Sequence, residues 1–127
     1  MKLARWTFGA AGLYGLIVIA PLYFLEDRIA QDTPPAITHP EYFYGFVGAA
    51  IAWQVAFLCI AIDPVRYRLL MIPSIVEKFA FASAVGALLL KNRVPAGVVG
   101  FASVDLVLGI LFVIAWVKTA GLRNAPQ

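Results

Sequence analysis

The chain has 127 residues and a net charge of +3, with 62% hydrophobic and 13% charged residues. Soluble domains hold about 45–50% apolar and about 25% charged residues, so this composition excludes an ordinary soluble domain and is typical of a membrane protein. The basic residues lie near the ends of apolar segments, where membrane topology accounts for them, and the net charge therefore does not predict nucleic-acid binding.

Four apolar segments follow one another along the chain, and each reaches the length of about 20 residues that crosses a bilayer core. They are residues 6–25, 42–62, 69–90 and 94–117. The first two hold no charged residue, the third holds only Glu77 and Lys78, and the fourth holds only Asp105. Because the runs are continuous and do not alternate, they predict helices and not a barrel. We expect a single membrane domain over residues 1–127, with helices at about 4–25, 41–62, 65–90 and 95–118.

Short motifs predict how two of these helices begin and where one bends. Thr38 and Glu41 have the spacing of a capping box before the second helix. Asp63, with a proline directly after it, fits a cap for the third helix. Pro73 lies inside the predicted third helix, where it should bend the helix just below Glu77.

The basic residues outside the apolar segments predict the orientation, because Lys and Arg are enriched in cytoplasmic loops. Six basic residues are predicted on one side of the membrane: Lys2, Arg5, Arg66, Arg68, Lys118 and Arg123. Three are predicted on the other side: Arg28, Lys91 and Arg93. Short connections make neighbouring helices antiparallel. We therefore expect an all-α integral membrane protein, an antiparallel four-helix bundle in the cell inner membrane with both termini in the cytoplasm.

Charged and polar residues within the segments predict a buried polar layer. A charge at the centre of a membrane helix costs about 2.5–3.5 kcal/mol, so Glu77, Lys78 and Asp105 should meet partners inside the bundle. With a rise of about 1.5 Å per residue, Tyr14 and Gln54 lie at a similar depth on the first two helices. These five residues are the candidate ligand-binding or buried polar network. In this hypothesis Glu77 is protonated and donates a hydrogen bond to a bound apolar molecule or to Gln54.

Aromatic residues are predicted to form a pocket wall beside this layer. Helical spacing places Phe101, Phe112 and Trp116 on the same face of the fourth segment as its acidic residue. It places Phe81 on the same face of the third segment as the glutamate. Two interpretations stay open: the polar residues bind a ligand, or they only pair with one another and fix the packing of the helices.

Other chemistries have little support in the sequence. There is one histidine, His39, and one cysteine, Cys59, whereas a transition-metal site takes several His, Cys or carboxylate ligands. We therefore expect no metal and no cofactor. No nucleophile–histidine–acid set or glycine-rich phosphate loop is visible, so no catalytic residue is assigned.

Residues 66–119, "RYRLLMIPSIVEKFAFASAVGALLLKNRVPAGVVGFASVDLVLGILFVIAWVKT", resemble the second half of small bacterial DoxX-like inner-membrane proteins. The resemblance implies a four-helix membrane architecture and, as for some members, an accessory role beside an oxidoreductase. The order of "HPEYFYGFVGAAIAWQVAFL" and then "MIPSIVEKF" is also similar in layout to the EXPERA group, which implies acidic residues in an apolar cavity.

Two functions from different classes follow. The first is an accessory or scaffold subunit of a larger membrane complex, or a homo-oligomer, in which the polar layer holds the helices together. The second is a binding protein or enzyme for a small apolar molecule, such as a quinone, an isoprenoid or a sterol-like lipid. A subunit should have a flank rich in small residues and shielded from lipid, whereas a binding protein should have a cavity open between its helices.

Overall fold

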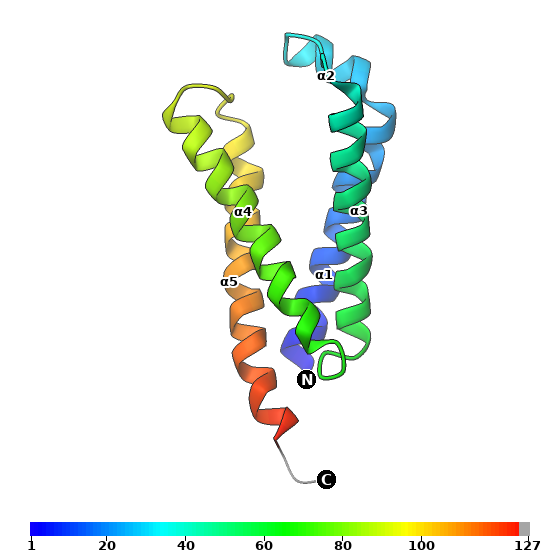
Figure 1. Cartoon of the computed structure of the whole chain (residues 1–127), viewed down its shortest axis with the longest axis vertical. Coiled ribbons are helices and arrows are strands. Elements are labelled where there is room, and N and C mark those ends of the chain that lie inside the picture. Colours follow the sequence, from blue (N-terminus) through cyan, green and yellow to red (C-terminus); the bar gives the residue numbers. More distant parts are fainter. Residues whose placement is uncertain (125–127) are drawn as a thin grey trace.

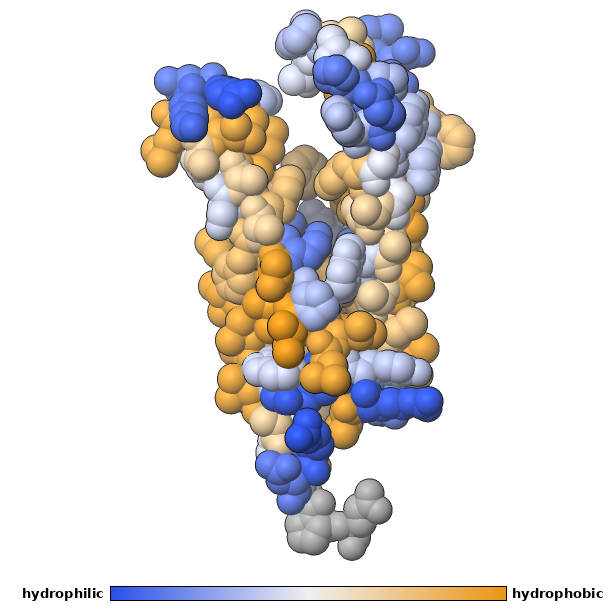
Figure 2. Space-filling view, viewed as in Figure 1, coloured by the Kyte–Doolittle hydropathy of each residue, from blue (hydrophilic) through white to orange (hydrophobic). Residues whose placement is uncertain are grey.

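The computed structural model describes residues 1–124, which form helices and turns and no strand. Four helical segments in this part of the chain are long and apolar enough to cross a membrane: Lys2–Phe24, Pro40–Ile62, Arg68–Leu90 and Val98–Arg123. Figure 2 shows an apolar band over the middle of the molecule and hydrophilic side chains toward its two ends. The prediction of four apolar helices of membrane-spanning length is confirmed, although the last two begin later than predicted and the last one is longer.

The first spanning segment changes its helical form near one end. It consists of α1 (Lys2–Ile19) and the tighter 3-10 helix η1 (Ala20–Phe24). Pro21 lies at the start of η1, and because proline has no N–H it cannot continue the α-helical hydrogen bonding. The sequence did not predict the short helix that follows, α2 (Glu26–Asp32). The Tyr44 hydroxyl donates to Glu26 Oε2 at 2.7 Å, which holds α2 against the next helix.

Two of the predicted helix caps are wrong, although the second predicted helix begins within one residue of its expected start. The helix α3 (Pro40–Ile62) begins directly after His39 and has no side-chain cap, so Thr38 lies one residue too early for the capping box. Asp63 Oδ1 accepts a hydrogen bond from the Arg66 N–H at 3.1 Å, but this caps a turn that leads into η2 (Arg68–Leu70). Only then does α4 (Met71–Leu90) begin. Pro73 therefore lies in the first turn of α4, where its missing N–H interrupts no hydrogen bond of that helix.

The helices form two pairs, α1 with α3 and α4 with α5 (Val98–Arg123), as Figure 1 shows. The pairs lie together at the end of the molecule that holds Met1, η2 and the last turn of α5. They separate toward the other end, where α2 and the turn between α4 and α5 lie. We call the first end the base and the second the open end.

The hydrophobic core occupies the base and joins the two pairs. The rings of Phe8 and Phe112 stack with centroids 4.0 Å apart, and Phe57 meets Phe112 edge to face at 5.1 Å. The buried members of this core are Ala4, Phe8, Ala11, Phe57, Ile60, Met71, Phe112 and Ala115. Arg68 lies over the Trp116 ring at 3.4 Å and donates from Nη2 to the Trp116 carbonyl at 2.8 Å. The base is therefore closed by packing, and the space between the pairs lies in the open half.

Glycines let the two helices of each pair approach closely. A Cβ on Gly12 of α1 would lie 2.9 Å from the Gln54 carbonyl oxygen of α3. A Cβ on Gly109 of α5 would lie 3.1 Å from the Phe79 ring and 3.3 Å from the Lys78 Cβ of α4. The close approach at Gly109 brings α5 beside the charged residues of α4.

Candidate functional site

Lys78 is buried and lies at the centre of a charged cluster whose two carboxylates are half-buried. The residue is 4% exposed, and its Nζ donates to Asp105 Oδ1 at 3.2 Å. The same Nζ lies 3.4 Å from Glu77 Oε2 and 5.2 Å from the centre of the Phe57 ring. One ammonium group from α4 thus lies between two carboxylates, one from its own helix and one from α5. A lone buried charge is costly, and this arrangement reduces the cost.

A cavity of about 440 Å³ lies beside this cluster, between the two helix pairs. Its volume falls within the range of about 300–1,000 Å³ that is typical of small-molecule sites. Figure 2 shows the hollow between the pairs toward the open end. The lining residues are Tyr14, Gly15, Val18, Ile19, Leu22, Phe46, Ala50, Glu77, Lys78, Ala80, Phe81, Val98, Phe101 and Asp105.

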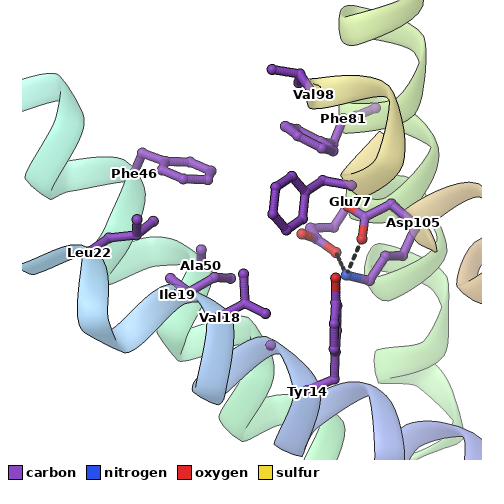
Figure 3. Close-up of a pocket in the computed structure, with 14 residues that line it drawn as sticks. Tyr14, Val18, Ile19, Leu22, Phe46, Ala50, Glu77, Phe81, Val98 and Asp105 are labelled. Atoms are coloured by element: carbon purple, nitrogen blue, oxygen red, sulfur yellow. Dashed lines mark hydrogen bonds and ion pairs between the residues drawn. The ribbon is translucent and has the colours of Figure 1, made fainter. Parts of the chain in front are cut away.

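The cavity has a polar floor and an apolar wall. In Figure 3 the Tyr14 side chain points from α1 toward the carboxylates of Glu77 and Asp105. Phe46 of α3 and Phe81 of α4 lie on opposite sides of the space above them. A molecule in this cavity would therefore meet charged and hydroxyl groups at one end and hydrocarbon elsewhere, an arrangement typical of sites that orient an apolar ligand by a few polar contacts.

The structure brings together six of the nine residues that the sequence singled out. Tyr14, Glu77, Lys78 and Asp105 meet at the floor, with Phe81 and Phe101 in the wall.

Gln54 is buried but does not line the cavity. It is 1% exposed, and its Nε2 donates to the Ala50 carbonyl at 3.0 Å. Its side chain packs directly against Gly15, whose missing Cβ makes room for the Gln54 Oε1 atom. Gln54 therefore supports the cavity from behind, and the predicted hydrogen bond with Glu77 is wrong. The Gln54 amide N–H bonds to the helix backbone, and no atom of residues 1–124 forms a hydrogen bond with its Oε1.

The predicted wall residues Phe112 and Trp116 are also misplaced. Both share a helix face with Asp105, but Phe112 lies in the core at the base and Trp116 lies against Arg68. Helical spacing predicts which face of a helix a residue lies on, but it does not predict how far along the helix a cavity extends. This cavity extends from Asp105 toward the open end and does not reach the base.

The wall residues on α1, η1 and α3 were not predicted, although their spacing in the sequence indicates that they share a helix face with a polar residue. Val18 and Leu22 follow Tyr14 at intervals of one turn, and Phe46 and Ala50 precede Gln54 in the same way. Each of these two sets of residues begins at a polar residue in the middle of a helix and continues along one helix face toward the open end. The apolar residues on that face therefore predict the cavity wall.

The described residues hold no group of three or more His, Cys, Asp or Glu side chains that could bind a metal ion. His39 Nδ1 lies 3.4 Å from Glu41 Oε1, but both side chains are exposed and neither lines the cavity.

No protein-family model, curated protein or solved structure matched the chain. The cavity and the charged cluster at its floor are therefore the features that point to a function.

Proposed function

We propose that the chain is a multi-pass protein of the cell inner membrane that binds a small apolar molecule with a polar end between its helices. The observation that carries the proposal is the cavity of about 440 Å³, which has an apolar wall and the Glu77–Lys78–Asp105 cluster at its floor. A polar layer that only held the helices together would leave no such space beside it. The cavity thus favours a binding protein over an accessory subunit, and a quinone, isoprenoid or sterol-like lipid would suit its apolar wall.

The cavity can be filled without disturbing the core. Ala80 lines the cavity and is exposed, so a tryptophan there should occupy the cavity while the packing at the base stays intact. We expect Ala80→Trp to lose at least half of the apolar molecule that purifies with the wild-type protein, as measured by native mass spectrometry. Ala87→Trp is the matched control, because Ala87 is exposed on the same helix and lies outside the cavity lining.

The result separates the two hypotheses. Equal retention of small molecules by both variants, or none in the wild type, would contradict the binding proposal. Stoichiometric co-purification of other membrane proteins in place of a small molecule would support the accessory subunit instead.

The proposal includes an antiparallel bundle with both termini in the cytoplasm, on the basis of the six basic residues on one side against three on the other. A reporter that is active only outside the cytoplasm should be silent when fused after Gln127. The same reporter inserted next to Pro35, in the long connection before α3, should be active. The opposite pattern of activity would reverse the orientation, and activity at both positions would contradict the bundle.

A further inference from the structure

The charges at the floor of the cavity do not balance. Glu77 and Asp105 supply two carboxylates, and Lys78 supplies the one ammonium group that lies within 3.4 Å of Glu77 and 3.2 Å of Asp105. With all three groups ionised, the cluster carries one net negative charge in a site where Lys78 is buried and the two carboxylates are half-buried. Because an uncompensated charge among membrane-spanning helices is strongly unfavourable, the carboxylate pair should hold one additional proton when no cation is bound.

Among the described residues, no other helix contributes a positively charged side chain to the cavity lining. Tyr14 is the titratable residue that α1 contributes to the lining, and a phenol adds no positive charge. The lining residues of α3 are Phe46 and Ala50, and α5 contributes Asp105 and apolar residues. The residues that line the cavity therefore offer a place for one further cation and repel an anion.

The wall of the cavity suits an organic cation. Four aromatic side chains line it: Tyr14, Phe46, Phe81 and Phe101. Aromatic faces attract cations, and cages of aromatic residues are a general means of recognising quaternary ammonium groups. The remaining wall is aliphatic, so the apolar body of the same molecule would also be accommodated.

We propose that the cavity binds a monovalent organic cation with an apolar body, and that the cation replaces the proton held between Glu77 and Asp105. This inference rests on the proposed function, since it names the chemical class of the ligand for the same cavity. When the cation enters, one proton leaves the carboxylate pair for water, and the net charge of the occupied floor stays at zero. Exchange of one cation for one proton makes the affinity rise with pH, by up to about tenfold per pH unit while the proton is bound.

Two probes of the same shape and opposite charge test this inference. Radiolabelled tetraphenylphosphonium and tetraphenylborate would be equilibrated with the purified full-length protein in detergent, with protein-free micelles as the background. We expect saturable binding of the phosphonium at about one per protein chain, with an affinity that rises with pH, and no saturable binding of the borate.

Variants locate the binding. Glu77→Gln removes one carboxylate and leaves a neutral Lys78–Asp105 pair, so phosphonium affinity should fall at least about tenfold and lose its pH dependence. Glu41→Gln removes an exposed carboxylate outside the cavity and should bind as the wild type does. Elution as a single folded species in size-exclusion chromatography would show that Glu77→Gln is intact, and the comparison of the two probes on the wild-type protein needs no variant.

The failures of the two proposals can be distinguished. If Ala80→Trp loses a native apolar molecule but the wild type binds both probes alike, or binds phosphonium independently of pH, the cation inference is wrong and the proposed function stands. If the wild type holds no apolar molecule and binds neither probe, both are wrong.

Discussion

Replacement of Lys78 by methionine should destabilise the protein by about 3–5 kcal/mol, because it leaves two half-buried carboxylates close together between apolar helices without a cation. Lys78 is 4% exposed, and its Nζ lies within hydrogen-bonding distance of Asp105 and 3.4 Å from Glu77. Asp105→Asn should cost less, about 1–3 kcal/mol, because Lys78 keeps Glu77 as a partner. Thermal unfolding in detergent would measure both changes, and Lys91→Met, at an exposed position, is the control.

The double variant Lys78→Met with Asp105→Leu tests whether the two residues interact. It removes one positive and one negative charge together, so much of the stability that Lys78→Met loses should return. Losses that simply add would show that Lys78 and Asp105 do not stabilise each other. The same double variant keeps Glu77 at the floor, where it would then be the remaining charged group of the cluster.

The sequence predicts the spanning helices well because each one is an uninterrupted apolar run. The ends of the helices are less predictable, since local contacts outside the apolar pattern decide them. Pro21 converts the last part of the first span to a 3-10 helix, and the Tyr44–Glu26 hydrogen bond supports a short helix that no hydrophobic run marks. Asn92 ends α4 with a positive φ of 55°, a backbone conformation that asparagine tolerates better than most residues.

The charged floor of the cavity could be predicted from the sequence for a physical reason that does not apply to the apolar wall. Charged groups in the middle of apolar helices must meet one another, so similar depth along each helix was enough to predict that Glu77, Lys78 and Asp105 come together. Depth alone was not enough for the neutral residues, since Tyr14 lines the floor and Gln54 does not. The wall depends on the angle between the two helix pairs, which the packing at the base determines. Phe112 and Phe101 are equivalent in the sequence pattern, yet one lies in the core and the other lines the cavity.

The cavity therefore depends on a core that lies below it. Phe112 of α5 is fully buried against Phe8 of α1 and Phe57 of α3, and these rings connect the two helix pairs at the base. The helix α3 makes few contacts with α4, so little else on that side of the molecule holds the pairs at their present angle.

Phe112→Ala should consequently lower the free energy of unfolding by about 3–5 kcal/mol, since it removes a large buried ring and leaves a hole where three helices meet. Phe24→Ala is the matched control: this ring is 88% exposed, and its loss should change the stability little. Phe8→Ala should cost a similar amount to Phe112→Ala, but the two changes together should cost less than their sum, because either one already removes the stacked pair. Thermal unfolding in detergent would measure all four proteins. Equal melting temperatures for Phe112→Ala and Phe24→Ala would mean that the rings at the base do not hold the pairs together, and the cavity between the pairs would then need another support.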